Sequence, residues 1–412
     1  MNDKDHVGSP RSLRARWVFP VAGSPLANAA VTIADGQIVA VGTAPNDVPV
    51  EDLGDVALVP GLVNAHTHLE FSDLAGPIGQ AGMNLVQWLR SVMEYRAEGR
   101  ARVGSPIVQG LAESIRYGVT TVGEIAQPGI FTYLHPRTRC EGTLFMELIA
   151  PTIERVAPVL GMAREHLRTA WRAGTWQHGL SPHAPYTVHP ELLAGAVALS
   201  VEYHAPLAMH LAESLEEIEF LRDGSGRFRE LLESRRVYDP AARPLGSRAL
   251  DELRVLSQAH RAIVIHGNYL DAEEIEFVGQ HNQRMAVVYC PRTHAWFDHA
   301  PYPLAALLAA GAVVALGTDS RASAPDLSLL AEMRHVARAF PKLSRATILE
   351  LGTLGGARVL GRQAEIGTLQ PGKWANLAAI RLPDAPADDP HELLLDADGP
   401  VVGTWIRGQQ AV

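Results

Sequence analysis

Cysteine and lysine are the scarcest of the residue types that could hold a metal or carry charge in this sequence. The 412 residues include only two cysteines, Cys140 and Cys290, which excludes a disulfide framework and a cysteine-rich metal cluster. Of the 36 basic residues, only Lys4, Lys342 and Lys373 are lysines, so none lies between residues 5 and 341. Any bound metal must therefore be held by histidines and carboxylates.

The sequence also lacks a basic run and an uncharged apolar stretch of membrane-spanning length. Its net charge is −9, which disfavours a polyanionic partner, and residues 1–6 are polar without an apolar leader segment. We therefore expect a soluble, cytoplasmic protein that binds neither nucleic acid nor membrane. We expect it to act on a small-molecule substrate and to form a homodimer.

Between the two ends of the chain, short apolar runs alternate with longer helical stretches, as a parallel α/β architecture requires. Eight apolar runs are predicted to be strands, and polar residues recur at their C-terminal ends. The fold class expected is α/β, a (β/α)8 TIM barrel spanning residues 62–364. Residues 216–236 are predicted to be helical and residues 239–246 to be a loop, so one connection is unusually long, as in lids and binding loops.

Both ends of the chain contain residue runs that are typical of β-strands. Residues 30–33 and 37–41 flank Asp35-Gly36, a strong hairpin signal, and residues 375–380 and 401–406 resemble them. We expect residues 1–61 and 365–412 to build one small β-sandwich domain together.

His66 and His68 form a His-x-His pair at the end of the first predicted barrel strand. Residues i and i+2 of a strand share a face, so the two imidazoles lie side by side. An isolated pair of this kind is more often two polar loop histidines. What favours a metal site is that other predicted strands end in similar residues: His183, His210, His266 and Asp319. Imidazoles with a carboxylate suit Zn²⁺ or Fe²⁺.

The motifs resemble the metal-dependent amidohydrolase superfamily, in its branch of aminohydrolases acting on purine-like and triazine rings. Residues 60–68, His210-Leu211-Ala212-Glu213, His266-Gly267 and residues 317–320 occur in the family order, and the match spans nearly the whole chain. The resemblance implies the ligand set and the catalytic residues. The metal ligands are His66, His68, His210 and Asp319; the catalytic residues are Glu213, His266 and Asp319.

Two-metal members of the superfamily commonly bridge their ions with a carboxylated barrel lysine. The predicted barrel strands contain no lysine, and Lys342 follows the last of them. We therefore expect one divalent ion, Zn²⁺ or Fe²⁺, which argues against dihydroorotase-like and hydantoinase-like chemistry.

A bound ion lowers the pKa of water, so hydroxide becomes available as a nucleophile. Asp319 can accept the water's proton, and His266 can hold the water in line. Glu213 follows a ligand by three residues and suits the proton relay to the ring nitrogen and the leaving amine. The alternative for Glu213 is a helix N-terminal acid before Ser214.

The substrate prediction rests on residues 66–72, 181–185 and 290–294, which most resemble nucleoside deaminases, particularly the aminofutalosine deaminases of menaquinone biosynthesis. The reaction predicted is deamination of an adenine-type nucleoside, with 6-amino-6-deoxyfutalosine as the substrate. Thr293-His294 departs from the Ser-Asn common in relatives, so contacts of His294 with the substrate differ. Hydrolysis of a guanine, triazine or imidazolone ring, or a non-catalytic scaffold, are the alternatives.

Five further residues are candidates for substrate contacts. Glu70 is predicted to bind ribose hydroxyls, His183 a ring nitrogen, and Trp88 the ligand's flat face. Arg292 and Arg321 are predicted to approach the pocket mouth, where Arg321 or Arg292 binds a substrate carboxylate with paired hydrogen bonds. The alternatives are a surface acid, a loop histidine, a helix core tryptophan and two loop-bracing arginines.

Overall fold

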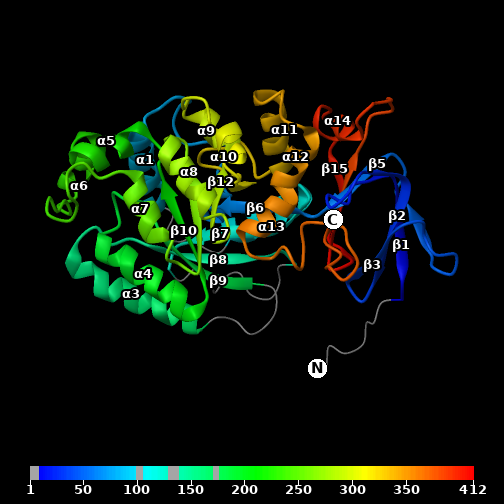
Figure 1. Cartoon of the computed structure of the whole chain (residues 1–412), viewed down its shortest axis with the longest axis horizontal. Helices are drawn as coiled ribbons and strands as arrows, with labels where there is room; N and C mark the ends of the chain where they lie inside the picture. Colours follow the sequence, from blue (N-terminus) through cyan, green and yellow to red (C-terminus); the bar gives the residue numbers. More distant parts are fainter. Residues whose placement is uncertain (1–8, 99–104, 129–138, 170–175) are drawn as a thin grey trace.

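The structure, a computed structural model, describes residues 9–98, 105–128, 139–169 and 176–412. The polar segment of residues 1–6, on which the absence of a leader was predicted, lies outside the described residues. The described chain forms a helix-covered barrel and, beside it, a smaller sheet that carries the C-terminus (Figure 1).

Eight parallel strands form the barrel, and their order in the sheet follows their order in the chain. They are β6 (Leu62–Thr67), β7 (Val119–Ala126), β8 (Glu141–Leu148), β9 (Trp176–Pro182), β10 (Pro206–Leu211), β11 (Arg261–His266), β12 (Met285–Tyr289) and β13 (Val313–Leu316). The carbonyl of His66 accepts hydrogen bonds from the backbone N–H groups of Thr318 (3.2 Å) and Asp319 (3.1 Å), which closes the barrel. The predicted fold class is confirmed.

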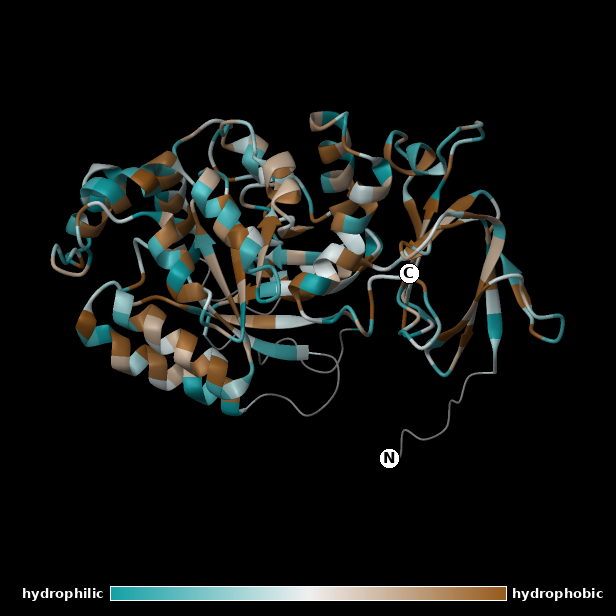
Figure 2. Ribbon diagram, viewed as in Figure 1, coloured by the Kyte–Doolittle hydropathy of each residue, from teal (hydrophilic) through white to brown (hydrophobic). Residues whose placement is uncertain are grey.

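The connections between strands carry the helices. They are α1 (Leu85–Glu98), α2 (Ser105–Arg116), α3 (Ile153–Arg168), α4 (Pro190–Tyr203), α5 (Leu215–Asp223), α6 (Gly226–Ser234), α7 (Ala249–Leu256), α8 (Ala272–Gln280), α9 (Pro291–Trp296), α10 (Leu304–Ala309), α11 (Leu329–Ala339), α12 (Arg345–Glu350), α13 (Gly356–Val359) and α14 (Pro390–Leu395). Hydrophobic and hydrophilic residues alternate along these helices, as expected where one face packs on a sheet (Figure 2).

The barrel strands are apolar on both faces because helices cover the outside while side chains fill the inside. In β11, Ala262 and Val264 pack in the same cluster as helix residues, whereas Ile263 and Ile265 join the cluster inside the barrel. Close packing of neighbouring strands needs a glycine at Gly317, where an added Cβ would lie 2.9 Å from the Cβ of His66. The strand that carries Asp319 is thereby held against the strand that carries the His-x-His pair.

Both ends of the chain build the smaller sheet, as predicted. Its strands run in the order β16-β15-β14-β5-β1-β2-β3, with β4 paired to β1. Their bounds are β1 (Arg11–Val18), β2 (Leu26–Ala34), β3 (Gln37–Gly42), β4 (Val50–Asp52), β5 (Val56–Pro60), β14 (Leu377–Arg381), β15 (Val401–Ile406) and β16 (Gln409–Gln410). All eight join one sheet, and residues of β1, β2, β5, β14 and β15 share one apolar cluster, so the sheet encloses its core. The predicted hairpin joins β2 to β3, with left-handed φ angles at Asp35 (51°) and Gly36 (76°).

The long connection between β10 and β11 carries α5, α6 and α7. One helix was predicted over residues 216–236, and this was wrong. Gly224 ends α5 with a left-handed φ of 60°, and α6 begins two residues later. Glycine adopts this conformation without steric cost, so it ends the helix where hydrophobic periodicity alone predicts continuation. The predicted loop at residues 239–246 precedes α7.

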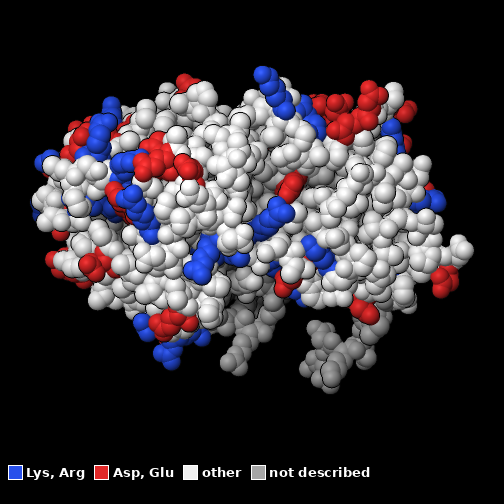
Figure 3. Space-filling model, in the orientation of Figure 1, with Lys and Arg blue, Asp and Glu red and all other residues white. Residues whose placement is uncertain are grey.

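On the face shown in Figure 3, Lys and Arg side chains are intermixed with Asp and Glu side chains. Within the described ranges, none of the helices combines the length and the apolar character needed to cross a membrane. The absence of a nucleic-acid partner stays a prediction.

Candidate functional site

The backbone turns sharply at the C-terminal ends of three barrel strands. Ala212, His266 and Asp319 have positive φ angles of 53°, 68° and 55°, although none is a glycine. Such conformations cost of order 1–3 kcal/mol each and cluster where the surrounding structure needs a particular side-chain direction. All three residues end or follow a strand at the same rim of the barrel. This rim is therefore the expected position of a functional site.

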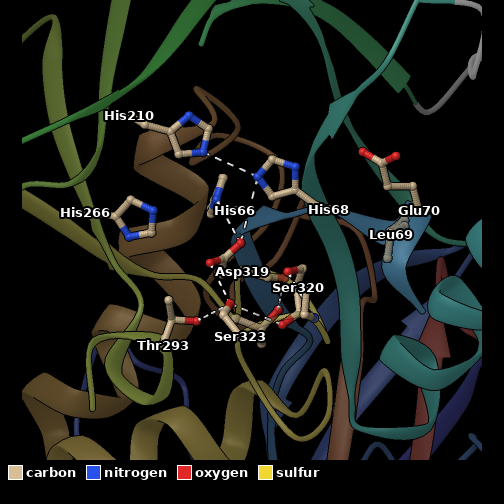
Figure 4. A network of polar contacts seen from close by, with 12 residues as sticks. His66, His68, Leu69, Glu70, His210, His266, Thr293, Asp319, Ser320 and Ser323 are labelled. Carbon is tan, nitrogen blue, oxygen red and sulfur yellow. Dashed lines mark hydrogen bonds and ion pairs between the residues drawn. The ribbon is translucent and has the colours of Figure 1, made fainter. Parts of the chain in front are cut away.

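His66, His68 and His210 converge at this rim (Figure 4). Their ring nitrogens lie within 4.8 Å of one another, and the Nε2 atoms of His68 and His210 are 3.3 Å apart. The Nδ1 of His210 contacts the carbonyl oxygen of His183 (3.0 Å), which directs Nε2 of His210 toward the other two rings. Burial and the neighbouring imidazoles hold the pKa of His68 and of His210 well below the usual range.

Asp319 completes the group. Its Oδ1 lies 3.7 Å from Nε2 of His66 and 3.8 Å from Nε2 of His68. Its Oδ2 accepts a hydrogen bond from the hydroxyl of Ser323 (2.8 Å), which in turn contacts the Thr293 hydroxyl (2.9 Å; Figure 4). Burial acts to raise the pKa of Asp319, but His66, His266 and Ser323 together outweigh it and lower the pKa.

This donor set fits one divalent ion. Ligands bound at about 2.0–2.1 Å in a tetrahedron lie about 3.3 Å apart. The spacings of His68 with His210 (3.3 Å) and of Asp319 with His66 (3.7 Å) and His68 (3.8 Å) are close to this value. Both ring nitrogens of His66 and the Nδ1 of His68 are buried without a hydrogen-bond partner. Buried polar atoms are rarely left unpaired, so the unpaired Nε2 of His66, which faces Asp319, indicates a missing ligand between these side chains.

Glu213 and His266 face each other beside the donor set. The Nε2 of His266 is 3.4 Å from Oε1 of Glu213, and both side chains are buried. Burial, and after it the carboxylates of Asp319, Glu217 and Glu216, raise the pKa of Glu213 well above its usual range. A raised pKa favours the protonated carboxyl, the form that can donate a proton to a substrate.

Glu213 does not serve as a helix N-terminal acid. Ser214 is the N-cap of α5, and its side chain accepts from the N–H of Glu217, so Glu213 precedes the helix. The Glu217 carboxylate accepts from the N–H groups of Ala212 (2.7 Å) and Glu213 (3.1 Å) and so fixes this turn. The side chain of Glu213 is therefore free to face the cavity.

A cavity lies over these residues, and it has one polar and one apolar side. Trp88 lines the apolar side, and its Nε1–H donates to the carbonyl of Ala322 (3.0 Å), so its ring is both packed and presented to the cavity. His183 lines the polar side, with Nδ1 held 2.7 Å from the Thr187 hydroxyl. Burial lowers the pKa of His183 to about 3, with a smaller effect from Arg96. Both residues were predicted at the site.

Arg96 and Glu147 line the same cavity and were missed by the sequence analysis. Glu147 belongs to the C-terminal half of β8, so the strand-end rule that found the other residues applies to it. Arg96 is on α1, and no pattern in the sequence indicates that its side chain lines the cavity. Glu70, predicted as a direct contact, lies behind Arg96 and accepts a hydrogen bond from its Nη2 (2.7 Å).

Arg292, His294 and Arg321 were predicted to bind substrate, but none of them lines the cavity. Arg292 donates to the carboxylates of Glu332 (2.5 Å) and Asp326 (2.8 Å). The other two are also engaged within the protein. The Nε2 of His294 contacts the carbonyl of Ala300 (2.9 Å), and Arg321 donates to Glu113 (2.9 Å) and to the carbonyl of Leu74 (2.8 Å). Loop bracing, the alternative considered for both arginines, is the arrangement found.

The buried ion pair of Arg292 with Glu332 predicts that replacing Arg292 lowers the stability of the protein. Glu332 is fully buried, and Arg292→Met would leave its carboxylate without a countercharge. Breaking a buried ion pair in this way lowers the free energy of unfolding by about 3–5 kcal/mol, measured as a shift of the urea midpoint. The matched control is Arg254→Met, because the pair of Arg254 with Asp251 is exposed and contributes at most about 1 kcal/mol. Unchanged stability with a selective loss on one substrate would restore Arg292 as a substrate contact.

The family model for the amidohydrolase family matches residues 57–411 of this chain. The chain therefore belongs to the amidohydrolase family. The expected enzyme class, a hydrolytic aminohydrolase of a metal-dependent family, is confirmed with it.

Two curated relatives and one solved structure are among the most similar proteins. The aminodeoxyfutalosine deaminase of Deinococcus radiodurans is 32% identical over 325 residues, covering 76% of this chain and 75% of its own. The 5-methylthioadenosine/S-adenosylhomocysteine deaminase of Moorella thermoacetica is 30% identical over 423 residues, covering 94% and 90%. The crystal structure of Helicobacter pylori aminofutalosine deaminase aligns with a TM-score of 0.83 and 22% identity, covering 98% of this chain and 100% of that one, which establishes the shared fold.

Proposed function

We propose that this protein is a metal-dependent hydrolytic deaminase of an adenine-type nucleoside and that its substrate is 6-amino-6-deoxyfutalosine, in menaquinone biosynthesis. The observation that carries the reaction type is the pairing of Glu213 with His266 beside the four-residue donor set. A carboxyl that has a raised pKa and is not needed as a ligand suits the release of ammonia from a ring carbon. The aminodeoxyfutalosine deaminase relative supports the substrate.

His66, His68, His210 and Asp319 would hold the ion. When bound, a divalent ion supplies an activated water by lowering the pKa of that water. Asp319 would accept a proton from the water, and His266 would orient the water toward the ring.

Glu213 would donate its proton to the ring nitrogen next to the reacting carbon as the carbon–oxygen bond forms. It would then take up the proton of the new hydroxyl and pass it to the amine, so that the carbon–nitrogen bond breaks, ammonia leaves and a ring carbonyl remains. The proton that Asp319 took from the water would restore Glu213. The raised pKa of Glu213 suits this role, because the carboxyl must carry a proton when the substrate binds. Trp88 and the other apolar lining residues keep bulk water from the ring.

The donor set predicts metal content. Four ligands suffice for one ion, and the barrel residues 62–341 contain no lysine that could bridge a second. Metal analysis of active protein should give about one Zn²⁺ or Fe²⁺ per chain. Two tightly bound ions at full activity would contradict the proposed site.

Ammonia release distinguishes the candidate substrates. The panel is 6-amino-6-deoxyfutalosine, 5-methylthioadenosine, S-adenosylhomocysteine, adenosine, guanine and a chlorotriazine. We expect the highest kcat/KM with 6-amino-6-deoxyfutalosine. A higher value with 5-methylthioadenosine or S-adenosylhomocysteine would favour the second candidate, which rests on the Moorella thermoacetica relative and its coverage of 94% of this chain.

Turnover of guanine or the triazine alone would place the enzyme among hydrolases of other heterocycles. A non-catalytic scaffold is disfavoured, because each of the four expected ligands is present and directed to one point. A homodimeric assembly and a cytoplasmic location stay predictions.

A further inference from the structure

Ala212 and Glu213, here called the Glu213 turn, have both of their N–H groups and both of their carbonyl groups paired with residues outside the turn. Strands β10 and β11 pair as far as Leu211 and His266, so the chain leaves the two strands at neighbouring points. The Glu213 turn therefore begins beside the strand end that carries His266.

Glu217 holds the two N–H groups of the turn. Its Oε1 accepts from the N–H of Ala212 (2.7 Å) and its Oε2 from the N–H of Glu213 (3.1 Å), and its side chain is fully buried. Ser214 and Glu217 have the spacing of a capping box, in which the glutamate accepts from the N–H of the N-cap residue. Here the carboxylate bonds to the two residues before the N-cap. Because Ser214 caps α5, the Glu217 carboxylate serves the Glu213 turn.

Asn268 and Tyr269 hold the two carbonyl groups. The Nδ2 of Asn268 donates to the carbonyl of Glu213 (2.9 Å), and the backbone N–H of Tyr269 donates to the carbonyl of Ala212 (2.9 Å). Asn268 is buried and follows His266 by two residues. Its side chain therefore ties the turn that carries Glu213 to the strand end that carries His266.

The placement of Glu213 relative to His266 is sensitive to small movements of the turn. The two side chains are 3.4 Å apart, and general acid–base catalysis needs heavy atoms within about 2.6–3.2 Å, so little displacement is tolerated. Ala212 and His266 both have positive φ angles, a strained conformation that persists only where surrounding contacts hold it. The hydrogen bonds from Glu217 and Asn268 are contacts of this kind.

We infer that Glu217 and Asn268 are positioning residues for the deamination. They hold the backbone of Glu213 from opposite sides, so that its carboxyl group faces His266 and the cavity. Neither is among the described residues that line the cavity, so both act through Glu213. The inference rests on the proposed function, in which Glu213 transfers protons.

The test replaces each positioning residue alone. Glu217→Gln keeps the size of the side chain but can accept from only one of the two N–H groups, and Asn268→Ala removes the donor to the Glu213 carbonyl. Each change should lower kcat by at least ~10-fold and keep KM within ~3-fold, because the substrate still binds but the proton relay is displaced. Metal content should stay at the wild-type level. Ammonia release from the nucleoside turned over best, with metal analysis of the same sample, measures all three quantities.

Combination with Glu213→Gln distinguishes positioning from a general structural role. If both residues act only through the Glu213 carboxyl, adding either change to Glu213→Gln should lower the residual kcat by less than ~3-fold. An equal loss of kcat with and without the Glu213 carboxyl would overturn the inference. Loss of metal, or wild-type kcat in both single variants, would also overturn it.

Glu274→Gln is the matched control for Glu217→Gln. The Glu274 carboxylate is also buried and also accepts from two backbone N–H groups, those of Leu250 (3.0 Å) and Asp271 (2.9 Å), but in the capping box of α8. The change should lower stability and keep kcat within ~3-fold of the wild type, because no catalytic group is displaced.

Asn282→Ala is the matched control for Asn268→Ala, because Nδ2 of Asn282 donates to the carbonyl of Gly311 (2.9 Å), away from the cavity. It should leave kcat unchanged. A urea unfolding curve shows whether each variant is folded, and if Glu217→Gln does not fold, Asn268→Ala decides the inference. If the wild type releases ammonia from no nucleoside, the proposed function fails and the inference falls with it.

Discussion

Replacing Glu213 by Gln is expected to lower kcat by at least ~10²-fold and to leave the metal content at the wild-type level. The reason is geometric. Glu213 faces His266 at 3.4 Å but is not one of the four side chains proposed to hold the ion. A glutamine fills the same space and keeps the metal ligands in place, but it cannot transfer a proton. Turnover and metal analysis on the same sample measure both quantities.

The control for this variant is Glu219→Gln. Glu219 lies on α5 after the Ser214 N-cap and does not line the cavity, so its change should leave kcat close to that of the wild type. Near-normal turnover in Glu213→Gln would move the proton relay to another group. Joint loss of metal and turnover would instead make Glu213 a ligand.

His210→Ala is expected to lose metal and activity together. Its Nε2 is one corner of the donor set, 3.3 Å from Nε2 of His68, and alanine leaves that corner without a ligand. Removing only a supporting partner of a metal-bound histidine typically costs 10–100-fold in affinity, so loss of the ligand itself should lower affinity by more than ~10²-fold. Titration of the apoprotein with Zn²⁺, followed by calorimetry, gives the affinity directly.

His260→Ala is the matched control, because His260 is an exposed histidine at the other end of the barrel, immediately before β11. It should bind metal as the wild type does. An His210→Ala protein that retains one tightly bound ion would remove His210 from the ligand set.

The site residues at the strand ends were predictable from this sequence because their pattern is local: an apolar run followed by a polar residue. Apolar runs mark the strands, and a parallel barrel brings their C-terminal ends together whatever the loops do. His66, His210 and Asp319 are therefore found together, although the first and last of them are separated by most of the chain. The same rule covers Glu147, the last residue but one of β8, which the sequence analysis overlooked.

Long charged side chains were not predictable in the same way. Arg292 and Arg321 were expected to contact substrate, but Glu332 and Glu113 reach them through packing that no local pattern encodes. A guanidinium binds whichever carboxylate the fold brings close. Arg96 shows the reverse case, since its helix happens to direct it into the cavity.

The sheet that joins both termini also sets an order of assembly during synthesis. Strand β5 lies between β1 and β14, and residues 61–376 separate it from β14 in the sequence. At about 5–20 residues per second, the ribosome needs roughly 15 to 60 s to supply that second partner. Throughout this interval one edge of an apolar, five-residue strand lacks its neighbour, and such edges pair readily with other chains. Chaperone protection therefore matters most during this interval, which ends only when the residues of β14 emerge from the ribosome.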